Sequence, residues 1–158
     1  MSDEQIVPLR IESAAELAAL HQRCMPAPDG WAEPGLKRLM QADAAIGVEA
    51  CHGDGSLAGF VLAFAAADEA EVLAICVAPE HRRSGVGRRL LRQLERDLAS
   101  RAITRLFLEA RASNLPARRL YEQAGFAETG RRRAYYAPAD GFAAEDAVLM
   151  AKSIAAGS

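Results

Sequence analysis

The feature that most constrains this chain is a glycine-containing loop between an apolar strand and an amphipathic helix. The apolar run at 72–77 predicts a buried strand, and the leucines at 90–98 lie along one face of a helix that runs to about residue 100. Between them stands the sequence Arg-Arg-Ser-Gly-Val-Gly at 82–87. Such a loop directs backbone N–H groups at a ligand, and the helix dipole favours negative charge there. The layout predicts a phosphate-binding site, and three arginines add positive charge around it: Arg82, Arg83 and Arg88.

Two common phosphate loops do not fit this segment. A Walker-type loop needs Lys and then Ser or Thr after its last glycine, but Arg88 and Arg89 follow Gly87. A dinucleotide-binding loop needs a third glycine three residues after the second, and Leu90 stands at that position. The phosphate ligand is therefore neither a nucleotide in a Walker loop nor a dinucleotide of the Rossmann type.

Length, charge and cysteine use limit the class of protein. A chain of 158 residues predicts a single domain over 1–158. A net charge of −2 gives no global electrostatic case for a nucleic-acid or membrane partner. The three cysteines are odd in number and scattered, which argues against a disulfide scaffold or zinc, so no metal is expected. Without a signal peptide or a membrane-spanning apolar run, we expect a cytoplasmic protein.

The first half of the chain predicts two helices followed by a hairpin. A capping box at 13–16 begins a helix that carries Leu17 and Leu20 on one face, and Pro34 lies in the first turn of a second helix. Strands are expected at 46–51 and 57–64, with a tight glycine turn between them.

The second half predicts alternating strands and helices. A strand at 71–77 leads into the glycine loop and its helix, and a further strand follows at 103–111. A short helix at 116–124 ends at Gly125, which suits a left-handed cap, and the segment 126–154 predicts two strands. The fold class is α/β with a mixed sheet.

Two motifs at the expected separation resemble the GNAT superfamily of N-acetyltransferases. The loop at 82–87 resembles its acetyl-coenzyme A motif, Arg/Gln-x-x-Gly-x-Gly/Ala, and 114–126 is similar to its second signature, Asn-x-x-Ala-x-x-Leu-Tyr-x-x-x-Gly-Phe. The resemblance implies the GNAT fold, a single mixed and mostly antiparallel sheet flanked by helices. In that fold the strands at 71–77 and 103–111 splay apart and hold acetyl-CoA between them.

A narrower resemblance, over about residues 68–152, is to the RimI family of ribosomal-protein alanine N-acetyltransferases. It rests on Leu-Glu-Ala-Arg-Ala-Ser-Asn at 108–114 and on Arg-Arg-Ala-Tyr-Tyr at 132–136. It implies direct transfer, in a ternary complex, of an acetyl group to the N-terminal alanine of a ribosomal protein. The first third matches only in layout and 142–144 looks inserted, so two alternatives stay open: a small-molecule amine N-acetyltransferase and a coenzyme A-binding sensor without turnover. The oligomeric state is not readable.

Two carboxylates are candidates for the general base. Glu109 lies in an otherwise apolar strand, where a carboxylate is costly unless it is paired or functional, and the resemblance places the catalytic glutamate there. The alternative is an ion pair with Arg105 or Arg111, which lie four and two residues away on the same face. Glu71 is the rival base, and strict alternation puts it on one face with Ile75.

The resemblance also assigns the remaining site residues. Tyr121 is the candidate acid that returns a proton to the leaving thiolate, the alternative being a tyrosine that only packs on the core. Cofactor contacts are implied for Ile75, Cys76, Val77, Arg82, Arg83, Ser84, Gly85, Val86, Gly87, Arg88 and Asn114, although Cys76 also suits a small core residue. Acceptor contacts are implied for Trp31, Tyr135 and Tyr136. The acidic Asp140, Glu145 and Asp146 either complement a basic peptide or are solvated, and the arginines at 131–133 are read as a solvated turn.

Overall fold

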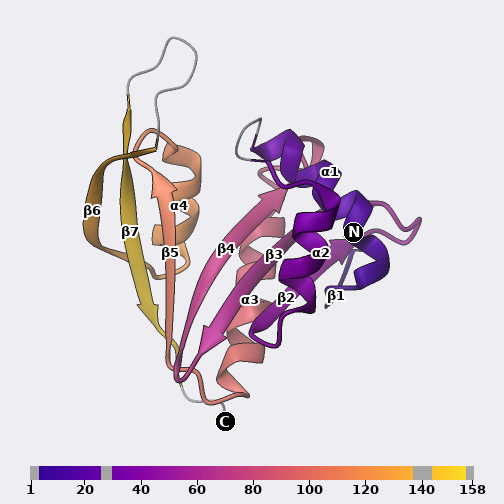
Figure 1. The fold of residues 1–158 in the computed structure, drawn as a ribbon, viewed down its shortest axis with the longest axis horizontal. Helices are drawn as coiled ribbons and strands as arrows, with labels where there is room; N and C mark the ends of the chain where they lie inside the picture. The colour runs from indigo at the N-terminus through magenta and orange to yellow at the C-terminus, as the bar shows by residue number, and fades with distance from the viewer. Residues whose placement is uncertain (1–3, 26–29, 137–143, 156–158) are drawn as a thin grey trace.

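The strands form one seven-stranded sheet with the order β1-β2-β3-β4-β5-β7-β6 (Figure 1). The structure is a computed structural model that describes residues 4–25, 30–136 and 144–155. Neighbouring strands are antiparallel except for β4 and β5, which are parallel. The sheet is therefore mixed and mostly antiparallel, as the sequence predicts. Within the described ranges, no helix is long and apolar enough to cross a membrane.

The elements follow the predicted order closely. They are β1 (Gln5–Pro8), η1 (Ile11–Ser13), α1 (Ala14–Cys24), α2 (Glu33–Gln41), β2 (Ala45–Cys51), β3 (Leu57–Ala66), β4 (Glu69–Val77), η2 (Pro79–His81), α3 (Val86–Ala99), β5 (Arg105–Arg111), α4 (Leu115–Gln123), β6 (Ala127–Tyr136) and β7 (Glu145–Ser153). Gly125 has φ +98°, which confirms the predicted left-handed cap of α4. The pattern does not single out β1, because a four-residue edge strand offers almost no period to recognise.

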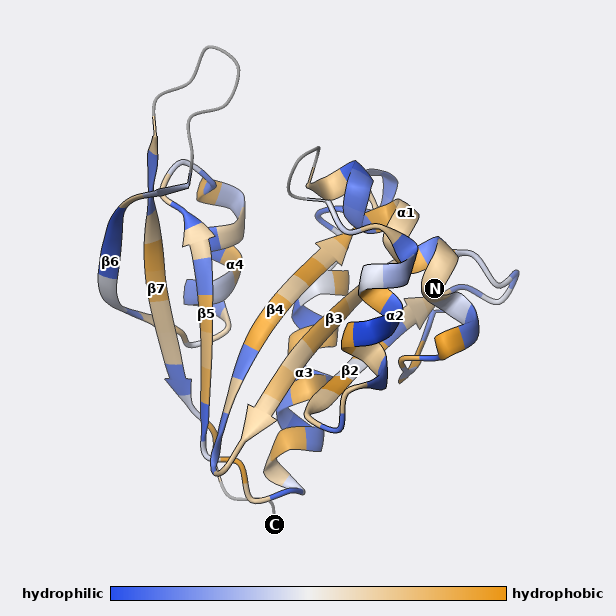
Figure 2. Ribbon diagram, viewed as in Figure 1, coloured by the Kyte–Doolittle hydropathy of each residue, from blue (hydrophilic) through white to orange (hydrophobic). Residues whose placement is uncertain are grey.

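Two local predictions are wrong. Ser13 makes no side-chain capping bond to α1, because it is the last residue of the 3₁₀ turn η1 and already has helical backbone angles. The arginines at 131–133 do not form a turn: they lie in the middle of β6, and Arg131 pairs with Glu128 at 2.7 Å. The sequence does not predict a strand at these arginines because β6 is exposed along almost its whole length. It therefore lacks the alternating apolar pattern by which a strand is recognised (Figure 2).

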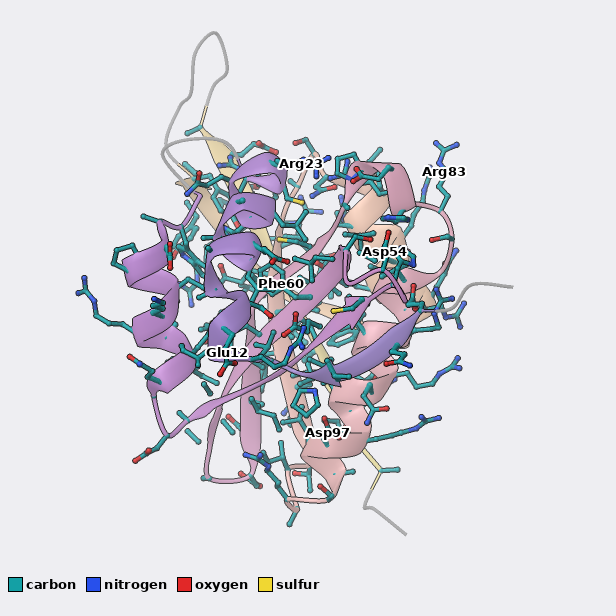
Figure 3. All side chains as sticks on the ribbon, turned by 90° about the vertical axis from the view of Figure 1, so that its right-hand side faces the viewer. Glu12, Arg23, Asp54, Phe60, Arg83 and Asp97 are labelled. Carbon is teal, nitrogen blue, oxygen red and sulfur yellow. The ribbon has the colours of Figure 1, made fainter. Side chains whose placement is uncertain are left out.

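The sheet is covered on both faces, which gives two apolar clusters. Helix α3 inserts Leu90, Leu91, Leu94 and Leu98 against the face that carries Val48 and Val61. On the other face, α1 and α2 contribute Leu17, Leu20 and Leu36, which pack with Phe60 beneath α1 (Figure 3). These helices cover β2, β3 and β4, whereas on the same side as α1 and α2 the strands β5, β7 and β6 carry no helix (Figure 1).

Strands β4 and β5 pair only where they begin. Three residue pairs join them, from Glu69 with Arg105 to Glu71 with Phe107. Beyond that point β4 stays with β3 through Val77, and β5 stays with β7 through Arg111. The sheet thus opens into a V between β4 and β5 (Figure 1).

A β-bulge in β4 coincides with the start of this opening. Leu62 of β3 lies opposite Ala74, and Ala63 lies opposite Val72, so Leu73 is an extra residue in β4. The bulge reverses the alternation of faces beyond it. The prediction that Glu71 shares a face with Ile75 is therefore wrong: Val72 and Ile75 pack in the α3 cluster, whereas Ala74 and Cys76 pack beneath α1.

Candidate active site

The free edge of β4 beyond the bulge lines one side of the opening. The N–H of Ala78 donates to Ala58 O at 2.8 Å, so Ala78 and, by alternation, Cys76 direct their backbone groups toward β3. Ile75 and Val77 accordingly direct theirs into the opening. Their side chains pack against the α3 cluster, so each of these two residues serves the core with its side chain and offers its backbone to a ligand. Of the three predicted edge residues, Cys76 faces the wrong way for a backbone contact.

The glycine loop ends in a helix N-terminus with free N–H groups. The first main-chain bond of α3 runs from Arg89 N–H to Gly85 O at 3.0 Å, so the N–H groups of Val86, Gly87 and Arg88 precede the helical ladder. Gly85, the N-cap, has φ +84° and provides no side-chain cap. Arg83 also has a positive φ, +65°, and its side chain extends away from the loop (Figure 3). The loop backbone is therefore an anion-binding terminus of the predicted kind.

The two loop glycines are required for different reasons. Gly85 adopts the left-handed region, where a Cβ is strained. Gly87 has ordinary backbone angles, but a Cβ there would lie 3.0 Å from Leu120 Cδ2 of α4. Gly87 thus allows the first turn of α3 to approach α4, a helix that lies beyond the V in the sheet order.

Two of the loop arginines are engaged by the protein itself. Arg82 Nε donates to Val77 O at 3.3 Å, and Arg88 donates to Gln123 O at 3.4 Å. Arg89 anchors the loop from below: it pairs with the nearly buried Glu4 at 2.7 Å and donates to Ser84 O at 3.1 Å. The charge of Arg82 is therefore held against the end of β4, and that of Arg88 against the C-terminal end of α4.

The structure brings together two cysteines that the sequence leaves apart. The thiol of Cys24, at the end of α1, approaches Val77 O at 3.7 Å and the Arg82 guanidinium at 3.7 Å. A hydrogen bond from Cys76 lowers the pKa of Cys24 to about 6, with further help from Arg82 and Arg23 and against the effect of burial. The same contact, together with burial, raises the pKa of Cys76 well above its usual range. Only the packing of α1 on β4 creates this pair.

Glu109 and Glu71 line the same open cavity. This cavity, of about 510 Å³, lies where β4 begins and pairs with β5, and it extends to β6 and β7. The Glu109 side chain is 20% exposed, and its Oε1 lies 3.6 Å from Nη2 of Arg132 on β6. The predicted alternative, an ion pair with Arg105 or Arg111, is not the pair that forms. Arg105 lies over the Phe107 ring at 5.1 Å, and Arg111 pairs with Glu145 at 3.4 Å.

Tyr121 lies on α4, and its side chain belongs to the apolar cluster that packs against α3. It is buried, and its ring meets Phe126 edge-on with centroids 6.1 Å apart. Burial raises the pKa of its hydroxyl well above the usual range, and the nearby Cys76 and Tyr136 raise it further. The hydroxyl is therefore a neutral donor at physiological pH. Because Cys76 belongs to β4 and Tyr136 to β6, Tyr121 lies within electrostatic range of both sides of the V.

The predicted acceptor residues occupy both rims. Tyr135 and Tyr136 meet at 83° with centroids 5.3 Å apart, and Tyr135 is exposed. The Arg111 guanidinium lies 4.2 Å from the Tyr136 centroid. On the opposite rim, the Trp31 ring stacks on His21 at 4.1 Å, and the backbone N–H of Trp31 donates to His21 Nδ1 at 2.9 Å.

The remaining predicted polar residues that lie in the described ranges make contacts within the protein. Asn114 Oδ1 caps α4 by accepting from Ala117 N–H at 3.3 Å. Ser113 and then Arg111 hold the pKa of Glu145 below its usual range, and Asp146 Oδ1 accepts from Ala134 N–H at 2.9 Å. Asp140 and most of the insertion at 142–144 lie outside the described residues. In the ranges that are described, no cluster of three metal-binding side chains occurs.

A sequence-family comparison agrees with this geometry. The family model described as the acetyltransferase (GNAT) family matches residues 14–126, which is well over half of the chain. The chain therefore belongs to the GNAT acetyltransferase family, and the splayed β4–β5 pair and the glycine loop are its characteristic arrangement.

Individual relatives narrow the comparison further. The ribosomal protein bS18-alanine N-acetyltransferase of Escherichia coli K12 is 44% identical over 101 residues, which are 64% of this chain and 67% of that enzyme. The crystal structure of the ribosomal-protein-S18-alanine N-acetyltransferase from Escherichia coli matches with a TM-score of 0.86 and 32% identity, covering 98% of this chain and 96% of that one. An aminoglycoside 6'-N-acetyltransferase complexed with coenzyme A shares the fold at a TM-score of 0.81 and 20% identity, covering 96% of this chain and 97% of that one.

The environment of Cys24 predicts an unusually reactive thiol. With a pKa of about 6, Cys24 is mostly thiolate at pH 7, and the thiolate is the form that is alkylated. We expect its iodoacetamide rate to be nearly flat above pH 7 and to fall as the pH drops through 6. Burial raises the pKa of Cys51, which makes it an internal control in the same sample. Peptide mass spectrometry reads both sites, and equal rates for Cys24 and Cys51 at pH 7 would contradict the prediction.

Proposed function

We propose that this GNAT acetyltransferase uses acetyl-CoA to acetylate the α-amino group of an N-terminal alanine on a ribosomal protein. The observation that carries the proposal is a carboxylate cavity, with Glu109 in its wall, at the base of a β4–β5 opening. The choice of acceptor is supported by the likeness to the Escherichia coli enzyme, which extends over nearly the whole chain.

The residues around the opening fit acetyl-CoA. The outward backbone groups of Ile75 and the N–H of Val77, whose carbonyl already accepts from Arg82, can pair with the amides of the pantetheine arm as an added strand would. The N-terminus of α3, with Gly85 and the N–H groups of Val86 to Arg88, suits the pyrophosphate. Asn114, which caps α4, is proposed to contact the same arm. When bound, acetyl-CoA supplies an acetyl thioester whose carbonyl a β4 N–H would polarise.

Glu109 is proposed to take the proton of the acceptor. A peptide α-amino group has an ordinary pKa of about 7.7–8.0, so much of it arrives as ammonium at neutral pH. The Glu109 carboxylate, one-fifth exposed in the cavity wall, can accept that proton directly or through one water. Glu71 lines the same cavity and stays the rival base.

Tyr121 is proposed to hold the proton that the leaving thiolate needs. A thiol has an ordinary pKa of about 8.5, and a tyrosine kept neutral by burial can donate to the sulfur as it leaves. Tyr135 and Tyr136, beside the cavity, and Trp31 on the opposite rim are proposed to contact the first residues of the acceptor.

The acceptor is tested with a panel of amines. The protein is mixed with acetyl-CoA and short peptides that begin with Ala, with N-terminally blocked peptides that carry Lys, and with spermidine and an aminoglycoside. We expect a mass gain of one acetyl group at the N-terminus of the Ala peptides. Acetylation of the small amines alone, or of Lys side chains alone, would show a different acceptor class. Tight binding of coenzyme A without any turnover would indicate a sensor.

Separate substitutions of the two carboxylates identify the base. Glu109→Gln keeps the size of the side chain but cannot accept a proton, so kcat should fall by about 10²–10⁴. Glu71→Gln removes a charge from the same cavity and should leave kcat nearly unchanged. Steady-state kinetics with an Ala peptide measure both variants. The reverse order of effects would assign the base to Glu71.

Tyr121→Phe separates the hydroxyl of this tyrosine from its packing. The ring and its contact with Phe126 are retained, so urea unfolding should be shifted by no more than about 1 kcal/mol. Loss of the proton donor should lower kcat by about 10²-fold or more while the KM for acetyl-CoA changes little. Phe126→Leu, which disturbs the same packing but leaves the hydroxyl, is the matched control. A Tyr121→Phe enzyme with full kcat would exclude the acid role.

A further inference from the structure

The charges around the cavity are unbalanced. Among the described residues, its lining includes three carboxylates, those of Glu69, Glu71 and Glu109, and one cation, that of Arg132. Three carboxylates in one cavity repel one another, and a cation among them offsets part of that repulsion. Arg132 therefore supplies positive charge beside Glu109 and reduces the repulsion among the carboxylates.

The contact between Arg132 and Glu109 has the geometry of an exchangeable pair. Its N···O separation is 3.6 Å, and the Arg132 side chain is 54% exposed. Exposed ion pairs of this kind contribute only about 0–1 kcal/mol. The guanidinium also lies 5.2 Å from the Tyr135 ring centroid, which gives the cation a second favourable position on the rim.

Strand register and a bulge in β6 together set this arrangement. Arg132 and Arg111 both lie opposite Ala147 of β7, which puts Arg132 on the face of the sheet that carries Glu109. The register between β6 and β7 then shifts between Arg132 and Tyr136, so β6 has extra residues after Arg132. Within this bulge Ala134 has φ +51°, and its N–H donates to Asp146 Oδ1 at 2.9 Å. The bulge re-aims Tyr135, whose ring centroid lies 5.2 Å from the Arg132 guanidinium.

We propose that Arg132 is a positioning residue whose guanidinium occupies, in the free enzyme, the position that the acceptor's ammonium group takes on binding. In the free enzyme the guanidinium pairs with Glu109. When the acceptor binds, its ammonium pairs with the Glu109 carboxylate instead, and the guanidinium moves onto the Tyr135 ring. The exchange replaces one cation by another, so the cavity keeps its charge balance throughout. An arginine cannot give up its proton, so the carboxylate stays available as a base until a cation that can lose one arrives. This inference rests on the proposed function, because it takes Glu109 as the base.

The proposal predicts a split between KM and kcat. In Arg132→Met the acceptor no longer competes with a guanidinium, so its KM should fall by about two- to fivefold, the factor that the upper range of an exposed ion pair allows. The value of kcat and the KM for acetyl-CoA should stay within about twofold, since Arg132 has left Glu109 when the reaction occurs. Arg132→Lys should restore the KM toward that of the unsubstituted enzyme. Steady-state kinetics with acetyl-CoA and an Ala peptide measure all of these values.

Arg133→Met is the matched control, because it removes the same charge from the adjacent position of β6. It should leave both KM values unchanged. A higher or unchanged acceptor KM in Arg132→Met, or a large loss of kcat with intact folding by circular dichroism, would overturn the proposal.

The proposed function fails separately, if the unsubstituted enzyme acetylates only a small amine. In that case the same KM comparison is made with that amine, whose ammonium meets the same cavity. If it acetylates nothing, calorimetric titration of the coenzyme A-loaded protein with the peptide replaces the kinetics, and equal affinities of the unsubstituted enzyme and Arg132→Met overturn the proposal.

Discussion

The short parallel pairing of β4 with β5 is the constraint on which the rest of the structure depends. Three residue pairs hold the two halves of the sheet together, and beyond them each strand keeps only its outer partner. Unpaired backbone N–H groups are costly when they are buried without a partner. A ligand with the hydrogen-bonding pattern of a strand could therefore pair with the backbone groups that face the opening.

The two sides of the opening are stabilised independently. The β4 side is clamped between α3 and α1, so Ile75 and Val77 cannot shift without disturbing the larger cluster. The β5 side is held by polar contacts at the C-terminal end of β5. There Glu145 pairs with Arg111 and accepts a hydrogen bond from the backbone N–H of Ser113. The close approach of Gly87 to Leu120 joins the sides behind the cavity. A V that is rigid on both arms can place a thioester and an amine in fixed relative positions, which is a large part of catalysing a two-substrate transfer.

The sequence predicted the fold because the fold has local signals. The glycine loop before α3 and the αL cap at Gly125 depend on neighbouring residues alone, and their placement is confirmed. The face of Glu71 could not be predicted, because a single bulge at Leu73 reverses the alternation and leaves no trace in composition. The partner of Glu109 was also missed: it comes from β6, a strand 18 to 27 residues further along the chain.

The sequence by itself determined where the proposed cofactor site begins, since a loop, a helix N-terminus and a strand edge are contiguous along the chain. It also determined which residue types were available as base and acid. Only the tertiary structure decided how they are combined: Glu71 with Glu109 in one cavity, Cys24 with Cys76 beside Val77, and Arg132 over Glu109. The physical reason is that these contacts join segments far apart in sequence. They depend on strand register and on bulges, and a shift of one residue there turns a side chain to the opposite face.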